Sequence, residues 1–368
     1  MKGYYFKKIC SSLLVLFLII TLNFFLPRMI FQDPAQPYFV GVPEDALALR
    51  EQIRQEHGFH QPIWVQYLQY LNRILTLDLG ESHYYKESVW VVMFSRIPWS
   101  MVLTVSSMFF SVLLGILLGS LAGRRRGAMM DRILLKLSGI STAIPSFWLA
   151  MVAVMLLGFQ LNWFPYRGAM TAGYTLTMQV PRFWWVLLGG SLVAVVLERI
   201  THRSLCLFLG LPLALLGALA AAIPLADLLD VAYHAALPVL ISVCAGAVSY
   251  GLLVRNSMIA VTNEDYIRTA RAKGLPPHVV LYKHTLRNAL LPLITNVGMS
   301  MASLLGGSVL MEKIFSWPGM GQLLLEACNT GDYLLSQAIL LLFAVITVVC
   351  NFLTDLVYHA FDPRVKEV

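Results

Sequence analysis

Stretches without charged residues alternate with short charged segments along the chain. Eight stretches contain no Asp, Glu, Lys or Arg, namely 9–27, 97–123, 137–166, 183–197, 204–226, 231–254, 288–311 and 333–354. A helix of about 20 residues crosses the roughly 30 Å hydrocarbon core of a bilayer. Seven stretches have about this length or more, and the shorter 183–197 spans fully only if its flanks are recruited or the bilayer thins. The pattern predicts an all-α polytopic membrane protein with about eight transmembrane helices.

The charges between these stretches predict the orientation. With the N-terminus in the cytoplasm, the cytoplasmic segments hold 18 of the 27 basic residues and six acids, and the outer segments hold nine bases and 13 acids. Cytoplasmic loops of membrane proteins carry an excess of Lys and Arg. Both termini are therefore expected in the cytoplasm. The net charge of +7 then reflects topology, so nucleic acid is not expected as a partner.

Composition agrees with a membrane protein. Of the 368 residues, 58% are hydrophobic and 13% are charged, whereas a soluble domain has about a quarter of its residues charged. This excludes an ordinary soluble enzyme, a disordered chain and a disulfide-stapled secreted module. The five cysteines are scattered and form no CxxC motif, which indicates small apolar fillers. The first stretch follows Lys7 and Lys8 and has no A-x-A cleavage site, so we expect an uncleaved anchor.

The segment 28–96 is expected outside the membrane. Within it, Val65, Leu68, Leu71 and Leu75 fall on one face of a short helix. Such a segment is either a solvated loop with helices lying on the membrane or a docking surface for an external partner. The pattern does not choose between the two.

The segment 255–287 is expected in the cytoplasm. Asn263 can cap a helix that begins at Glu264, and basic residues fall in its last turn. Gly274 follows at the position that favours a left-handed backbone, and Pro276 and Pro277 prevent continuation. A short rigid helix of this kind suits the transmission of force to another protein, although a solvated loop helix gives the same pattern.

Two further groups of residues are candidates for a transport pathway. The outer linker 311–332 contains a turn cluster, in which Trp317 is expected at the membrane interface with Pro318, Gly319 and Gly321 beside it. The polar residues of two spans that could line a pore are Ser242, Ser249, Asn296, Ser300, Ser303 and Ser308. Hydrogen bonds between helices explain each of these polar residues equally well.

Several kinds of chemistry lack their motifs. No GxxxxGK[ST] loop and no HExxH occur, and His57, His60 and His83 are typical of surface residues, so no metal site is expected. An intramembrane hydrolase needs a Ser beside a base, but Ser308 and His359 are expected near opposite faces of the membrane. Carboxylates near mid-membrane, typical of ion-driven carriers, are missing. A pore opened by an outside source of energy fits these features.

The motifs then identify a resemblance. The segment 264–275 (EDYIRTARAKGL) resembles the cytoplasmic loop of bacterial ABC importer permeases, in the dipeptide/oligopeptide/nickel family and the first of its two subunit types. Further similar segments are QPIWVQY at 61–67, LDLGES at 77–82, IPSFW at 144–148, WFP at 163–165, HTLRNALLP at 284–292, EKIFSWPGMG at 312–321, DY at 332–333 and DPRV at 362–365. Together they cover 1–166 and 232–368 in the family order.

The resemblance implies a type I ABC importer permease fold and a set of partners. These partners are a second homologous permease, two P-loop ATPase subunits that bind ATP and Mg, and an extracytoplasmic binding protein, in the bacterial plasma (inner) membrane. This chain would bind no cofactor and carry no catalytic residue. Its ATPase-coupling loop would consist of Glu264, Asp265, Tyr266, Arg268, Thr269, Ala270, Arg271, Ala272, Lys273, Gly274 and Leu275. Peptides are the first choice of solute, and nickel or a metal chelate is the alternative.

The chain departs from the family pattern in two places. The family signature begins Glu-Ala-Ala, where this chain has Arg268, Thr269 and Ala270. Residues 170–230 look inserted and would add two spans to the usual six, with a cytoplasmic turn at 198–203. The expected organisation is an N-terminal helix 1–27, an outer segment 28–96, two helices in 97–166, an inserted hairpin in 167–230, and core helices with the coupling loop 255–287 in 231–368.

Overall fold

The computed structural model of the chain describes residues 2–30, 39, 47–56, 58, 60–171, 180–201, 214, 217–218, 221, 225–300 and 309–361. The regular structure in these residues is helical, and the one isolated β-bridge joins Glu81 to Ser88. The helices are α1 Lys2–Ile30, α2 Leu47–Glu56, α3 Ile63–Leu75, α4 Val89–Arg124, α5 Met129–Ala143, α6 Ser146–Ala153, η2 Val154–Gln160, α7 Val180–Thr201, α9 Leu225–Thr262, α10 Asp265–Ala272, α11 Pro277–Val279, η3 Val280–Leu286, α12 Arg287–Ala289, α13 Leu291–Ser300, α14 Val309–Ile314, α15 Met320–Thr330 and α16 Tyr333–Phe361.

Four helices are long and apolar enough to cross a membrane. They lie in α1, α4, α9 and α16, and a fifth candidate span is the bent pair α5 and α6–η2. These helices confirm the predicted spans at 9–27, 97–123, 231–254 and 333–354. The predicted total of eight is not reproduced, since the described residues give four or five.

The three other stretches with a described helix differ from straight spans. The stretch 137–166 bends by 92° between α5 and α6, because Pro145 has no N–H to donate and Ile144 before it takes an extended backbone. The stretch 288–311 contains the end of α12, the ten-residue α13 and the start of α14, and residues 301–308 between α13 and α14 lie outside the described residues. The stretch 183–197 lies within α7, whose apolar part is Arg182–Val193. Most of 204–226 lies outside the described residues.

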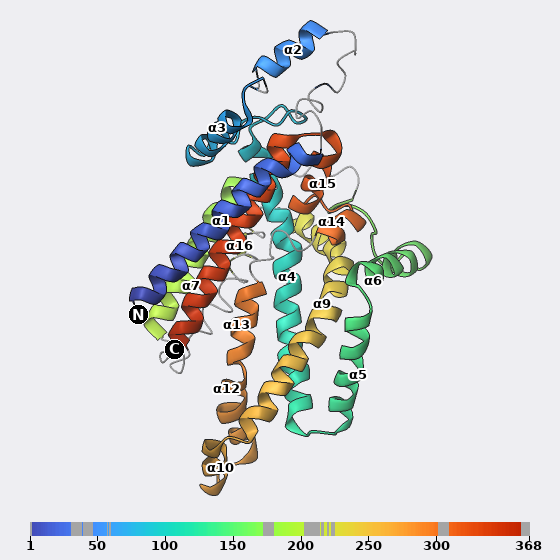
Figure 1. Ribbon diagram of the computed structural model, residues 1–368. Coiled ribbons are helices and arrows are strands. Elements are labelled where there is room, and N and C mark those ends of the chain that lie inside the picture. The colour runs from blue at the N-terminus through green and yellow to red at the C-terminus, as the bar shows by residue number, and fades with distance from the viewer. Residues whose placement is uncertain are drawn as a thin grey trace.

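Helices α4 and α9 form the centre of the molecule and are its most extensively packed pair (Figure 1). Small residues recur every fourth position along α4, at Ser111, Gly115, Gly119 and Gly123. A Cβ atom added to Gly119 would lie 2.5 Å from the carbonyl oxygen of Gly251 in α9. The two backbones therefore touch along a stripe of small residues, as helices in membranes do.

The remaining helices surround this pair. Helix α16 packs on α1, where the Asn23 Nδ2 donates to the Gln337 carbonyl at 2.8 Å. The predicted surface helix of the 28–96 segment is confirmed as α3, and its Tyr67 and Tyr70 contact Thr21 and Asn23 of α1 through hydrogen bonds. Its apolar face is exposed at two of its leucines.

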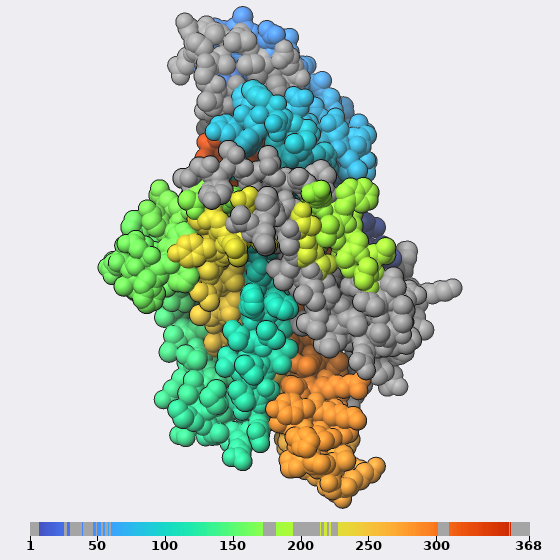
Figure 2. All heavy atoms as spheres, turned by 180° about the vertical axis from the view of Figure 1, so that it is seen from behind, coloured from blue at the N-terminus to red at the C-terminus, as the bar shows by residue number. Residues whose placement is uncertain are grey.

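The molecule has two distinct ends. Helices α2, α3 and α15 lie at one end, and α10 with its neighbours lies at the other (Figures 1 and 2). The first residues of α1 and the last of α16 lie toward the α10 side (Figure 1). We call these the α3 end and the α10 end.

Candidate functional site

Helix α10 is the predicted short helix of the 255–287 segment. It runs from Asp265 to Ala272, so it begins one residue later than predicted. The residue before it is Glu264, whose side chain makes no capping hydrogen bond. The predicted cap by Asn263 is therefore wrong, because Asn263 belongs to the turn that ends α9 and its N–H donates to the Ala260 carbonyl at 3.2 Å.

The C-terminal stop of α10 has the predicted form. Gly274 takes a left-handed backbone with φ of +71°, and its N–H donates to the Arg271 carbonyl at 3.0 Å. The N–H of Leu275 donates to the Ala270 carbonyl at 3.4 Å. These two bonds form a Schellman motif, which satisfies carbonyls that the helix end leaves free. Pro276 then caps α11, whose first residue is Pro277, because proline is suited to a first helical turn.

One face of α10 attaches it to the rest of the protein. Ile267 and Ala270 are buried with Val280 of η3, and Val261 of α9 and Leu275 pack against them. The Asn288 Nδ2 donates to the Tyr266 hydroxyl at 2.8 Å, which joins α10 to α12. The opposite face is exposed and carries Asp265, Arg268, Thr269 and Ala272. Helix α10 is thus fixed on one side and open for a partner on the other.

A buried ion pair joins α9 to α5 at the same end. The guanidinium of Arg255 donates from Nε and Nη2 to the two carboxylate oxygens of Asp131, at 2.7 and 3.1 Å. The Gly127 N–H also donates to Asp131, at 2.7 Å. Asp131 precedes the uncharged stretch 137–166 and is 2% exposed. The bond from Arg255, followed by the bond from Gly127, holds the pKa of Asp131 below its usual range.

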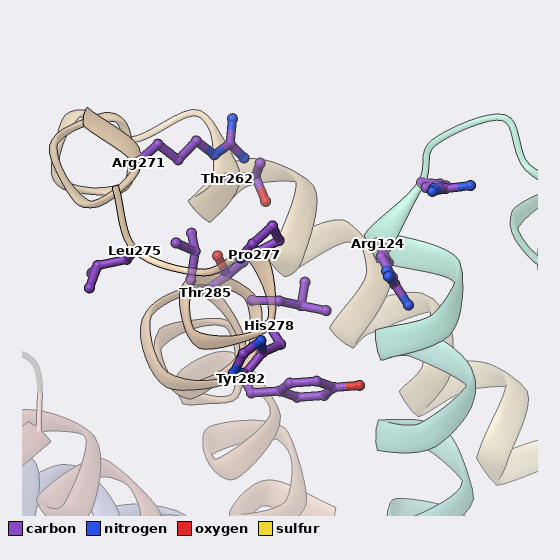
Figure 3. A pocket seen from close by; sticks show the side chains of 12 residues that line it. Arg124, Thr262, Arg271, Leu275, Pro277, His278, Tyr282 and Thr285 are labelled. Atoms are coloured by element: carbon purple, nitrogen blue, oxygen red, sulfur yellow. The ribbon is translucent and has the colours of Figure 1, made fainter. Parts of the chain in front are cut away.

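A cavity of about 550 Å³ separates the α10 loop from the end of α4. Its lining consists of Gly123, Arg124, Arg125, Thr262, Arg271, Leu275, Pro277, His278, Val280, Leu281, Tyr282 and Thr285. In Figure 3, Arg124 extends from α4 on one side, and the Tyr282 ring extends from the α10–η3 side toward α4. Gly123, Arg124 and Arg125 therefore lie close to the predicted coupling segment in space, although they are far from it in sequence.

At the other end, the loop before α15 folds around a buried carboxylate. Glu312 is fully buried and accepts hydrogen bonds from the Ser100 hydroxyl at 2.7 Å and from the N–H groups of Gly321 and Gln322 at 2.7 and 3.1 Å. The Ser100 oxygen in turn accepts from the Met320 N–H at 2.7 Å. Glu312 thus caps the first turn of α15 and connects it to α4.

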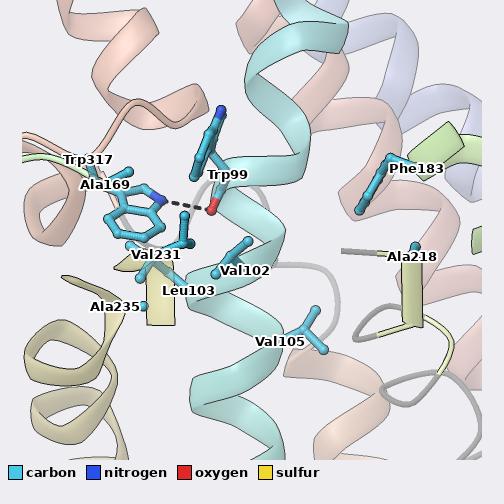
Figure 4. Packing of buried hydrophobic residues seen from close by; sticks show 10 residues of the cluster. All are labelled: Trp99, Val102, Leu103, Val105, Ala169, Phe183, Ala218, Val231, Ala235 and Trp317. Atoms are coloured by element: carbon cyan, nitrogen blue, oxygen red, sulfur yellow. Dashed lines mark hydrogen bonds between the residues drawn. The ribbon is translucent and has the colours of Figure 1, made fainter. Parts of the chain in front are cut away.

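This arrangement explains the turn cluster and corrects one prediction. A Cβ on Gly319 would collide with the Glu312 carboxylate, so the loop needs glycine there. Trp317 is fully buried, and its Nε1 donates to the Trp99 carbonyl at 2.9 Å (Figure 4). The predicted interfacial position of Trp317 is therefore wrong: the ring packs in the core cluster between α4 and α9.

A second buried carboxylate holds the outer segment. Asp332 accepts from the Ser82 hydroxyl at 2.5 Å and from the N–H groups of Tyr84 and Leu335 at 3.1 Å each. The motifs at 77–82 and 332–333 are about 250 residues apart in sequence, and this carboxylate brings them together. Sequence reasoning had no signal for these contacts beyond the motifs themselves.

The predicted pathway residues are only partly brought together. The Tyr250 hydroxyl of α9 donates to Ser300 of α13 at 3.3 Å. Ser242 and Ser249 donate to carbonyls four residues earlier in their own helix. Asn296 is exposed, and Ser303 and Ser308 lie outside the described residues. Helix-internal hydrogen bonds thus account for Ser242 and Ser249, and only Ser300 links two helices.

Sequence reasoning missed three features: the Asp131–Arg255 pair, the small-residue stripe of α4, and the role of Glu312. A signal existed for two of them. The four-residue spacing of Ser111 to Gly123 is readable, and Asp131 is the one acid among the bases of 124–136. Glu312 belongs to a motif, but nothing in the motif shows which donors surround its carboxylate.

Comparison with known proteins adds the family. The family model of the binding-protein-dependent transport system inner membrane component matches residues 115–367, and the model of its N-terminal part matches residues 1–104. The chain is 30% identical to the di/tripeptide transport system permease protein of Pseudomonas aeruginosa, over 94% of this chain and 93% of the relative. It is 31% identical to the oligopeptide transport system permease protein of Bacillus subtilis, over 100% of both. It is also 31% identical to the glutathione transport system permease protein of Pectobacterium atrosepticum, over 100% of this chain and 99% of the relative.

Proposed function

The chain belongs to the family of binding-protein-dependent transport system inner membrane components, and on this premise we propose that it forms half of the path by which an ATP-driven importer moves peptides across the bacterial inner membrane. As a permease subunit, it works by conformational change and is not itself an enzyme. The permease names of its relatives support peptides as the solutes, since two of these relatives transport di/tripeptides or oligopeptides and a third transports the tripeptide glutathione. These names favour peptides over nickel or a metal chelate, and they favour transport over intramembrane hydrolysis.

The geometry of α10 carries the proposal for coupling. The helix has a buried face that fixes it to α9 and η3 and an exposed face with Arg268, Thr269 and Ala272. We propose that this exposed face docks on one of two ATPase subunits, which bind ATP and Mg. Two residues connect α9 to α10, so a displacement of α10 would move α9 directly.

The same contacts suggest how the displacement spreads. Arg255 of α9 holds Asp131 of α5, and α9 packs along α4 on glycine backbones. Helices α4, α5 and α9 would therefore move together as a rigid group, in the way of a hinge or shear transition between inward and outward states. A second, homologous permease would provide the other half of the path.

The α3 end would face the binding protein. In this orientation both termini are cytoplasmic, in accord with the distribution of basic residues. The loop of Trp317, Pro318, Gly319 and Gly321 would then form part of the external gate, and Ser242, Ser249, Asn296, Ser300 and Ser303 would face the path. The buried contacts of Glu312 support a gate that moves with α4, because Ser100 of α4 is one of its donors.

Peptide uptake in cells tests the proposal. A strain of the source bacterium that lacks this chain is complemented with the wild type, with Arg268→Glu, or with the control Arg132→Glu, and uptake of labelled dipeptide, tripeptide and nickel is measured. Arg268 is 73% exposed and its pair with Asp265 is at the surface, so its loss costs well under about 1 kcal/mol of stability. We expect Arg268→Glu to reduce peptide uptake at least tenfold at unchanged protein level.

The control variant Arg132→Glu distinguishes a loss of docking by α10 from a general effect of reversing a charge at the α10 end. Arg132 is also exposed at the α10 end but lies outside α10, so Arg132→Glu should transport normally. Purification of both variants should recover the ATPases with Arg132→Glu and far less of them with Arg268→Glu. Uptake of nickel but not of peptides by the wild type would contradict the solute assignment, and full uptake by Arg268→Glu would contradict the coupling assignment.

A further inference from the structure

The cavity between α4 and the α10 loop has an uneven distribution of charge. Its cationic side chains are Arg124, Arg125 and Arg271, with His278 beside them, and none of its twelve lining residues is acidic. The acids nearest in sequence have other partners: Asp265 pairs with Arg268 at 3.4 Å, and Asp131 pairs with Arg255. Within the part of the chain that the structure describes, the guanidinium groups of the three arginines make no hydrogen bond or ion pair, although the backbone carbonyls of Arg125 and Arg271 accept turn bonds. The cavity therefore attracts an anion from outside the chain.

The other part of the lining is apolar. Leu275, Pro277, Val280 and Leu281 belong to it, and the Tyr282 side chain is 57% exposed. In Figure 3 the ring of Tyr282 extends toward the end of α4, on the opposite side from Arg271. A free inorganic anion would gain nothing from these groups. An amphiphile with an anionic head and an apolar body would contact both parts of the lining.

The position of the cavity along α4 indicates its depth in the membrane. The uncharged stretch 97–123 ends at Gly123, which itself lines the cavity, and the basic residues Arg124 and Arg125 follow at once. The cavity thus lies where the hydrocarbon region ends and the headgroup layer begins. Tyrosine is enriched at this depth, and arginine binds phosphate through two parallel hydrogen bonds.

We propose that this cavity binds the phosphate of an anionic phospholipid of the cytoplasmic leaflet, with Arg124, Arg125 and Arg271 around the headgroup and Leu281 and Tyr282 against its apolar part. Basic pockets between transmembrane helices on the cytoplasmic side favour such lipids. The volume of about 550 Å³ lies in the range of pockets for small ligands. The bound lipid bridges α4 to the segment that follows α10. The proposal rests on the membrane placement of the chain but not on its solute.

Native mass spectrometry of the purified chain tests it. The chain in detergent is titrated with phosphatidylglycerol or with phosphatidylcholine of the same acyl chains. The dissociation constant of the first bound lipid is measured for each. We expect the wild type to bind phosphatidylglycerol at least tenfold more tightly. Because each arginine near a lipid headgroup contributes about fivefold in affinity, Arg124→Gln/Arg125→Gln should bind phosphatidylglycerol about 30-fold more weakly and phosphatidylcholine as before.

The control variant is Arg132→Gln/Lys136→Gln. It removes the same charge from the same basic segment, but neither residue lines the cavity, so its preference should equal that of the wild type. If the double arginine variant unfolds, Arg271→Gln serves in its place, with an expected loss of about fivefold. Both variants are checked by gel filtration before the titration.

Four outcomes would overturn the proposal. The first is an equal affinity of the wild type for the two lipids, and the second is an unchanged preference in Arg124→Gln/Arg125→Gln. The third is displacement of phosphatidylglycerol by millimolar inorganic phosphate, which would assign the cavity to a free anion. The fourth is the absence of any lipid preference together with loss of co-purifying ATPase in the arginine variant, which would assign the cavity to an acidic side chain of a partner protein. None of these measurements uses transport, so the lipid proposal can fail while the assignment of peptides as solutes stands.

Discussion

At the scale of single residues, one carboxylate and two glycines hold the loops at the two ends of the molecule. Glu312 is buried and accepts from one hydroxyl and two backbone N–H groups. Gly319 has no room for a Cβ beside that carboxylate, and Gly274 has φ of +71° with open space around it. Glycine is thus needed at the two positions for different reasons: the first for close approach and the second for backbone conformation.

The Glu312 contacts predict the cost of its removal. Glu312→Ala leaves the Ser100 hydroxyl and two N–H groups without their acceptor in a buried place, and an unsatisfied buried donor costs about 1–3 kcal/mol. We expect the purified variant to melt several degrees below the wild type. Glu312→Gln keeps an acceptor oxygen and should lose less. Equal melting temperatures of Glu312→Ala and wild type would show that the carboxylate does not hold this loop.

The backbone of Gly274 makes a local prediction. In Gly274→Ala an L-residue must adopt the left-handed conformation, which costs about 1 kcal/mol, and no side-chain clash adds to this. Amide hydrogen exchange in α10 should become about fivefold faster. Gly139→Ala, also in open space but at an ordinary helical position of α5, should leave exchange in α10 unchanged. Equal rates in both variants would refute the role of the C-terminal stop.

At the scale of elements, two contacts join α4, α5 and α9. The stripe of small residues brings α4 and α9 to backbone contact, and the Asp131–Arg255 pair attaches α5 to α9 near the point where α9 leads into α10. Both contacts lie between segments more than 100 residues apart in sequence. A third contact, the Asn288–Tyr266 hydrogen bond, fixes α10 to the helix that follows it.

The close contact of α4 and α9 along the stripe of small residues predicts that one added methyl group would push the two helices apart. In Gly119→Ala the new Cβ would lie 2.5 Å from the Gly251 carbonyl oxygen and 2.6 Å from the Cβ of Val254. Overpacking of this kind costs about 1–3 kcal/mol, so the melting temperature should fall. The matched control is again Gly139→Ala, whose Cβ meets nothing within 4 Å and which should be neutral or slightly stabilising.

The Asp131–Arg255 pair predicts a dependence on pH. Because the folded-state pKa of Asp131 is lowered, the pair stabilises the folded state above the unfolded carboxyl pKa of about 3.9 and loses this effect as the pH falls through the lower folded value. Asp131→Asn should therefore melt below the wild type at pH 7 and at pH 5, by an amount equivalent to about 3 kcal/mol. The difference should narrow only below about pH 4. A gap that already closes near pH 6 would contradict the assignment to this carboxylate.

At the scale of the whole molecule, the two ends carry different kinds of surface. The α10 end has the arginine cavity and the exposed face of α10, and the α3 end has the buried carboxylates Glu312 and Asp332 that fix its loops. The apolar helices between them are long enough to cross a bilayer. The proposed contacts with an ATPase at the α10 end and with a binding protein at the α3 end rest on this difference.

The orientation in the membrane can be measured directly. In a variant without native cysteines, single cysteines are placed at Lys86 of the outer segment or at Lys136 and Thr269 of the α10 end, all exposed. An impermeant maleimide added to intact spheroplasts should label Lys86→Cys and should label the other two only after permeabilisation. Labelling of Thr269→Cys from outside would reverse the topology and remove the basis for ATPase docking.

The membrane class, four of the apolar spans and the short α10 with its glycine stop could be predicted from the sequence, and the motifs indicated the family. The spans and α10 follow from local properties: the length of an uncharged run, the backbone freedom of Gly274 and the restriction imposed by Pro276 and Pro277. The bend at Pro145, the burial of Trp317 and the partners of Asp131 and Glu312 became apparent only from the folded structure. Burial and partners depend on which distant segment of the chain packs against a residue. A hydrophobic pattern shows only that a face of a helix is apolar, and an apolar face can contact either lipid or protein. The sequence pattern is therefore the same in both cases.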